Sequence, residues 1–99
     1  DDMAVGAIQA IKEAGLKPGE DIKIVAIDAV PDAHLAIANG EMNATIELTP
    51  NMAGPALDAL EAYLETGEAP EKWIQTESKL FTAEDDNMAI YEEKKNLGY

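Results

Sequence analysis

Cysteine is absent from this 99-residue chain, and other residue types that carry chemistry are scarce. Without cysteine the chain has no disulfide, no thiolate metal site and no cysteine nucleophile. His34 is its one histidine, so the spacing of a structural zinc site is missing as well. Ser78 is its one serine, and no nucleophile-elbow glycines surround it, which gives a serine hydrolase no support.

The chain also has few basic residues, and it has no long apolar run and no phosphate-binding glycine loop. Seven basic residues face twenty acidic ones, a formal net charge of −13, so nucleic acid and anionic lipid are poor partners. No apolar stretch approaches the roughly 18 residues of a membrane span. The acidic run at residues 84–86 lacks the glycine and the alternation of a calcium loop. With no nucleophile, metal set or cofactor loop, an enzyme is disfavoured, and no cofactor is expected.

Five residues are aromatic, and one of them is tryptophan. Trp73 could stack on a sugar ring, but an indole buries much surface, and packing is the expected role. His34 lies among alanines in a predicted helix, and we expect it on the solvated surface.

Apolar spacing and turn residues predict alternating helices and strands. A helix with Met3, Ile8 and Ile11 inward, capped by Asp1 or Asp2, is expected to stop at Gly15. The later elements are a strand at 22–27, a helix from 31 to 39, a strand at 43–48, a helix at 51–65, an extended stretch at 72–76 and a last helix. That helix is expected to begin at a capping box of residues 82 and 85, with residues 88 and 91 inward.

The predicted strands pose a packing problem. The run at 22–27 is nearly continuous in apolar residues, as in parallel strands that helices cover on both faces. Two such strands need helices above and below, and usually more strands beside them. The chain supplies too few elements, so part of the fold is expected to lie outside it.

Five segments in register carry a family resemblance. DDMAVGAIQA at 1–10 is similar to "N-D-E-M-A-x-G-A" at a helix start, and KPGEDI at 17–22 leading to IVAID at 24–28 resembles "PG-D-I-x-V-x-G-F-D". PDA at 31–33, GEMNATI at 40–46 and TES with FTAE at 76–84 continue the match. The chain thus resembles the C-terminal part of a periplasmic sugar-binding protein of the ribose-binding type, a solute receptor of an ABC transporter.

The resemblance implies a fold about three times longer than this chain. It has two Rossmann-like lobes of α/β structure, each a doubly wound parallel sheet, joined by a hinge. Residues 1–48 would form a βαβ segment of the C-terminal lobe. Residues 49–77 would cross the hinge and give a helix to the N-terminal lobe, and residues 78–99 would return to the C-terminal lobe as a terminal helix.

Three acidic residues are candidates for ligand binding. Asp28 ends the first strand, where open α/β sheets bind ligands, and its carboxylate suits adjacent hydroxyls; the alternative is a helix cap. In the family, an aspartate at this place contacts the sugar. Asp1 follows the position of a family asparagine and could touch ligand or cap its helix. Glu47 or Thr49 could replace the family glutamine where this chain has Leu48, although strand alternation points Glu47 away from the Leu48 side.

These observations favour a receptor that holds a monosaccharide or a sugar-like solute between two lobes and then docks on a membrane permease. Such a receptor is periplasmic or lipid-anchored outside the cytoplasm. The alternative is the effector-binding domain of a lac-repressor-type transcriptional regulator. Without the missing N-terminal portion of the receptor, the chain is expected to bind sugar weakly or not at all. Its open strand edges are expected to favour self-association.

Overall fold

The computed structural model describes residues 1–97 and 99. In this range the chain forms four helices and three strands, in the order α1 (Asp2–Glu13), β1 (Val25–Asp28), α2 (Pro31–Ala38), β2 (Ala44–Glu47), α3 (Ala53–Thr66), β3 (Leu80–Thr82) and α4 (Asn87–Lys94). The four predicted helices and the first two strands are confirmed within a few residues. The stretch at 72–76, expected to be extended, forms no strand, and β3 was not predicted.

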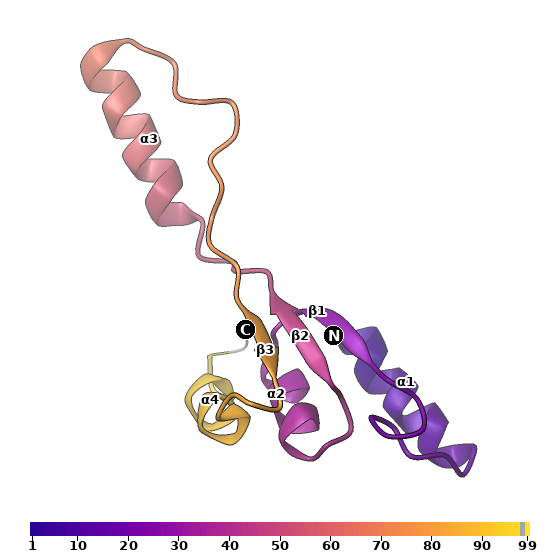
Figure 1. Ribbon diagram of the computed structural model, residues 1–99. Coiled ribbons are helices and arrows are strands. Elements are labelled where there is room, and N and C mark those ends of the chain that lie inside the picture. Colours follow the sequence, from indigo (N-terminus) through magenta and orange to yellow (C-terminus); the bar gives the residue numbers. More distant parts are fainter. Residues whose placement is uncertain (98) are drawn as a thin grey trace.

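β1, α2 and β2 form a βαβ unit at the centre of the fold (Figure 1). β1 and β2 are parallel, with Val25 opposite Ala44 and Asp28 opposite Glu47. α2 is the crossover, and its first residue, Pro31, suits a helix start because proline presets φ and needs no donor there. β3 pairs with the other edge of β2 in the antiparallel direction. The predicted α/β class, a piece of a larger parallel sheet, is therefore confirmed, with one antiparallel strand added.

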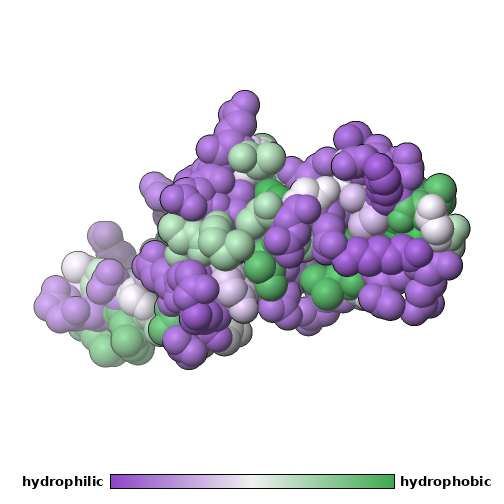
Figure 2. Space-filling view, turned by 90° about the horizontal axis from the view of Figure 1, so that it is seen from below, coloured by the Kyte–Doolittle hydropathy of each residue, from purple (hydrophilic) through white to green (hydrophobic). Residues whose placement is uncertain are grey.

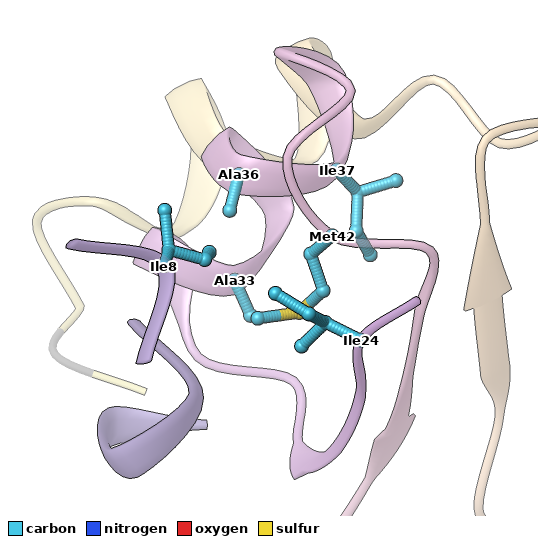
Figure 3. Close-up of a cluster of buried hydrophobic side chains, with 6 residues drawn as sticks. All are labelled: Ile8, Ile24, Ala33, Ala36, Ile37 and Met42. Carbon is cyan, nitrogen blue, oxygen red and sulfur yellow. The ribbon is translucent and has the colours of Figure 1, made fainter. Parts of the chain in front are cut away.

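One face of the sheet carries the core. Figure 3 shows the cluster, in which apolar side chains from α1, α2 and the segments flanking the strands meet: Ile8, Ile24, Ala33, Ala36, Ile37 and Met42. In α1 it is Ile8, with Ala4 and Ile11 beside it, that points inward. Met3 was expected inward and is exposed, whereas the expected inward positions of Ile8 and Ile11 are confirmed. α1 and α4 lie on either side of α2, so the three helices form one layer.

The opposite face of the sheet is bare. Val25 is 74% exposed, and Ile27, Ile46 and Leu80 beside it are also exposed. Together with Ala26 and Ala44 they line a shallow apolar hollow. Burying such side chains is worth about 1.5–3 kcal/mol each, so a sheet of this composition is expected to be covered in its complete fold. The shortfall of elements expected from the sequence is therefore visible in the structure.

α3 stands away from the sheet as an arm (Figure 1). The described chain measures 61 × 25 × 21 Å, with a radius of gyration of 17.7 Å, against about 13 Å for a compact domain of 100 residues. No residue of α3 is buried, and its apolar stripe of Leu57, Leu60 and Leu64 faces solvent. Trp73, on the returning segment, was expected to pack but is 81% exposed. The arm has the composition of an element that packs on something outside this chain.

His34 corrects a second expectation. It was placed on the surface, but its ring is fully buried between α2 and α4. Its Nδ1 lies 2.9 Å from Oδ1 of the buried Asn87, and its ring packs edge-on against Phe81, with the ring centres 4.7 Å apart. Its Nε2 is buried without a hydrogen-bond partner. His34 therefore joins α2 to α4, a role that alanine neighbours in the sequence did not indicate.

The start of α4 also differs from the expectation. Asp86 caps the helix by accepting a hydrogen bond from the backbone N–H of Ala89. Thr82 and Asp85, the predicted capping box, instead close the turn before it, where the Asp85 carboxylate accepts from the Thr82 N–H at 2.9 Å. This bond, with help from the nearby Lys79 ammonium, lowers the pKa of Asp85. Met88, which was expected inward, is exposed.

The surface seen from below mixes purple hydrophilic atoms with green hydrophobic patches (Figure 2).

Within residues 1–97 and 99, no helix combines the length and the apolar character needed to cross a membrane.

Candidate functional site

Asp28 ends β1 in an unusual backbone conformation. Its φ is 127° and that of the next residue, Ala29, is 61°, values that residues with a side chain rarely adopt. A strained backbone costs about 1–3 kcal/mol per residue and persists where the surrounding structure holds it, often at ligand-binding sites. The turn directs the chain from the strand end straight into α2. Asp28 is thus left at the carboxyl edge of the sheet, as the strand-end rule predicted.

Asp1 and Thr45 hold this turn. The Thr45 hydroxyl, fully buried on β2, accepts a hydrogen bond from the Ala29 N–H at 3.2 Å and donates one to Asp1 Oδ1 at 2.8 Å. The other oxygen of Asp1 accepts from the Val30 N–H at 2.9 Å. Asp1 occupies the N-cap position of α1, but its side chain makes no cap hydrogen bond. Its expected capping role is therefore replaced by a bridge from α1 to the β1–α2 turn.

A small cavity of about 170 Å³ opens at the same edge of the sheet. It is lined by Asp28, Val30, Glu47, Leu48, Thr49, Pro50, Lys94 and Tyr99. The Asp28 side chain is 48% exposed, so its carboxylate can meet a solute from outside. Asp1 is not among the lining residues, and its side chain is enclosed. The structure brings two of the three candidates, Asp28 and Glu47, into one cavity.

Glu47 and Leu48 both reach this cavity despite their alternation along β2. β2 ends at Glu47, and Leu48 lies beyond it, where the period of two no longer governs the side chains. The argument that discounted Glu47 therefore does not apply at this position.

Lys94 and Tyr99 are cavity residues that the sequence reasoning missed. Lys94 comes from the last turn of α4, and its Nζ lies 3.8 Å from Oε1 of Glu47 and 3.5 Å from the carbonyl oxygen of Ala29. Nothing in the spacing connects Lys94 with the ends of β1 and β2, because the contact depends on how α4 packs against α2.

The chemistry of the cavity suits a polyhydroxylated solute. Two carboxylates accept hydrogen bonds, an ammonium donates them, and a phenol does both. Within residues 1–97 and 99, no cluster of three or more histidine, aspartate or glutamate side chains is placed to hold a metal ion.

Comparison with known proteins adds relatives over the whole chain. No family model matches the sequence. The chain is 58% identical over 99 residues to the galactofuranose-binding protein of Escherichia coli (strain K12), matching 100% of this chain and 31% of that protein. It is 39% identical over 83 residues to the fructose import binding protein of Bifidobacterium longum (strain NCC 2705), matching 84% of this chain and 24% of that one.

Solved structures agree with these relatives. The crystal structure of a galactofuranose binding protein superimposes with a TM-score of 0.87 at 57% identity, over 100% of this chain and 33% of that one. The periplasmic binding protein of the arabinose ABC transporter from Shewanella sp. ANA-3, bound to α- and β-L-arabinofuranose, gives a TM-score of 0.86 at 52% identity. It covers 98% of this chain and 32% of that one. The chain thus spans about a third of the length of the relatives that it matches.

A parallel βαβ unit with carboxylates at the strand ends, an open sheet face and an unpacked arm is typical of a piece of a doubly wound α/β fold. The relatives make the assignment specific. Over its whole length the chain matches a segment of periplasmic sugar-binding proteins of ABC transporters, which confirms the resemblance to receptors of the ribose-binding type.

Proposed function

We propose that this chain works as the C-terminal part of a sugar receptor that serves an ABC transporter. Residues 1–48 form a βαβ segment of the C-terminal lobe. Residues 49–77 cross the hinge and give α3 to the N-terminal lobe, and residues 78–99 return to the C-terminal lobe with α4. The exposed apolar stripe of α3 and its distance from the sheet support this division, since a helix of one lobe would not pack on the other.

The observation that carries this proposal is the position of Asp28. Asp28 is the last residue of a parallel strand and begins a turn of positive φ. Its half-exposed carboxylate lies beside Glu47 in the same cavity. A carboxylate there accepts hydrogen bonds from neighbouring sugar hydroxyls, and hydrogen bonds to charged groups contribute about 1.5–3 kcal/mol each. Asp1 supports the site from behind, through Thr45 and Val30, rather than by touching the sugar.

The sugar is best sought among furanoses. One relative is a galactofuranose-binding protein, and two related structures hold arabinofuranose and fucofuranose. Leu48 stands where ribose receptors have a glutamine, and a leucine cannot pair with hydroxyls, so the ribose contacts are not carried over. A five-membered ring with several free hydroxyls could pair with the Asp28 and Glu47 carboxylates that line the cavity at the sheet edge.

The receptor acts by closing its two lobes over the sugar and presenting the closed form to a membrane permease outside the cytoplasm. Closure requires contacts with both lobes, because a ligand shifts an equilibrium only through its differential affinity for the two states. The sugar leaves unchanged, as expected from relatives that are binding proteins. The relatives include a fructose import binding protein and the binding protein of an arabinose ABC transporter, which favours this receptor over an effector-binding domain of a regulator.

Calorimetry on the full-length receptor that carries this chain tests the proposal. Galactofuranose, L-arabinose and ribose should be compared, and we expect galactofuranose or L-arabinose to bind more tightly than ribose, with recovery of unchanged sugar. The change Asp28→Asn keeps the shape of the side chain but removes its charge, and should weaken binding about tenfold or more. The matched control is Asp32→Asn, on the exposed start of α2, which should leave affinity unchanged. Equal affinity of the Asp28 variant and the wild type would contradict the assigned site.

A further inference from the structure

Lys94 is a partly buried cation at the edge of the sheet. Its side chain is 19% exposed, and it is the one basic side chain among the described residues that line the cavity. Its ammonium lies 3.8 Å from the Glu47 carboxylate and 3.5 Å from the Ala29 carbonyl oxygen. One side chain of α4 therefore reaches the ends of both parallel strands.

Two negative charges lie close together at this edge, and a nearby cation stabilises them. Asp28 and Glu47 are register partners on β1 and β2, and both carboxylates line one cavity. Like charges opposite each other on neighbouring strands destabilise a sheet and push the side chains apart. A positive charge beside Glu47 offsets this repulsion and fixes the direction of its carboxylate. The arrangement leaves the pair of acceptors ready before a solute arrives.

The contact with Ala29 fixes the turn that carries Asp28. On one side of this turn, Thr45 and Asp1 accept hydrogen bonds from the N–H groups of Ala29 and Val30. Lys94 binds the carbonyl of Ala29 on the other side. A turn with φ of 127° and 61° relaxes unless its polar groups are held, so the N–H and C=O contacts act together.

The packing of α4 directs Lys94 to this place. Asn87 at the start of α4 lies against the buried His34 of α2 and also donates to the Thr82 carbonyl at 2.7 Å. These contacts anchor the first turn of the helix, and Lys94 follows two turns later on the same side. A lysine in a last turn also favours the helix dipole, but Lys95 supplies that charge equally well and faces solvent with Glu92. The contacts of Lys94 with the strand ends are therefore not explained by the dipole.

We infer that Lys94 is a positioning residue of the sugar site, acting through Glu47 and through the Asp28–Ala29 turn. The inference rests on the proposed function, because it assigns a role within the same cavity. It makes the C-terminal helix part of the binding machinery. It also predicts that affinity for a sugar depends on a residue that need not touch the sugar.

Calorimetry and thermal unfolding of the full-length receptor test this role, with L-arabinose and galactofuranose as probes. Lys94→Met keeps the aliphatic stem and removes the charge, and should weaken binding about tenfold. Lys94→Arg should restore most of the affinity. The matched control, Lys95→Met, removes the neighbouring charge, which lies outside the cavity, and should change affinity less than twofold.

A double-mutant cycle with Glu47→Gln separates positioning from a merely structural role. If Lys94 acts through Glu47, the loss caused by Lys94→Met should be smaller in the Glu47→Gln background than in the wild type. Fully additive losses, or wild-type affinity of Lys94→Met, would overturn the inference while leaving the Asp28 result intact. A wild-type receptor that binds none of the sugars would overturn the proposed function and this inference together.

Discussion

At the residue scale, Thr45 does more for the site than its place in a strand suggests. Its hydroxyl is the link between Asp1 on α1 and the backbone of Ala29. Strand alternation predicts whether such a threonine is buried, but not which backbone group it meets. Asp28, by contrast, could be named from the sequence as a candidate for ligand binding, because ligands bind at the carboxyl ends of parallel strands.

Replacing Thr45 by valine should destabilise the protein and weaken sugar binding together. The change keeps the shape but leaves the Ala29 N–H and an Asp1 oxygen unpaired in a buried place, which costs about 1–3 kcal/mol. Urea unfolding and calorimetry of the full-length receptor measure the two effects. Thr66→Val, on the exposed end of α3, is the control and should change stability by less than about 0.5 kcal/mol. A Thr45 variant as stable as the control would contradict the role of the hydroxyl in holding the turn.

At the scale of elements, the loop before β1 is fitted closely to the end of α2. Gly19 has a φ of 81°, and a Cβ placed there would lie 2.1 Å from the carbonyl oxygen of Gly40. The Gly19 carbonyl also accepts a hydrogen bond from the Asn43 amide, whose oxygen binds the Ile24 N–H. These contacts fix where β1 starts, and therefore where Asp28 ends it.

Gly19→Ala should be strongly destabilising, while Gly6→Ala should not be. The first change combines a positive φ with a backbone clash, for a cost of about 2–5 kcal/mol. Gly6 lies in the exposed middle of α1 with nothing within 4 Å of a new Cβ, and alanine there should stabilise the helix by up to about 1 kcal/mol. Urea unfolding of both variants in the full-length receptor gives the comparison. Equal stabilities would mean that the loop moves freely away from Gly40.

Most elements could be predicted because their signals are local. Glycine stops, the proline at the start of α2 and apolar periodicity gave the helices and the two parallel strands. β3 was missed because it has three residues, too few for a pattern, and exists through pairing with β2. The burial of His34 was also missed, since it follows from the docking of α4 on α2, while the cap of α4 at Asp86 is a local signal that was assigned to the wrong residue.

At the scale of the whole molecule, the chain exposes apolar surfaces and a strand edge that a complete receptor is expected to cover. The bare sheet face, the free edge of β1 and the apolar stripe of α3 are all surfaces that need a partner. An exposed strand edge with apolar neighbours is a template for pairing with another chain. In the proposed receptor the rest of the polypeptide covers these surfaces.

The 99-residue chain by itself should therefore self-associate and bind sugar weakly or not at all. Light scattering should show a dimer or a larger species, and calorimetry with L-arabinose and galactofuranose should show little heat. Ile27→Lys places a charge on the bare sheet face and should shift the chain toward monomer. Met3→Lys, at a site that is more exposed than Ile27 but lies on α1, is the control and should change the assembly less. A monodisperse monomer with submillimolar affinity for sugar would contradict the expectation.

The sequence by itself determined the helices, the two parallel strands, the candidate role of Asp28 and the shortage of elements around the sheet. Each of these follows from local propensity, or from counting what a two-sided sheet must have against it. Tertiary structure alone decided that Asp1 braces a turn, that His34 is buried and that Lys94 reaches the strand ends. Those facts depend on contacts between segments tens of residues apart, and the energy of such a contact is set by packing geometry that no local pattern encodes.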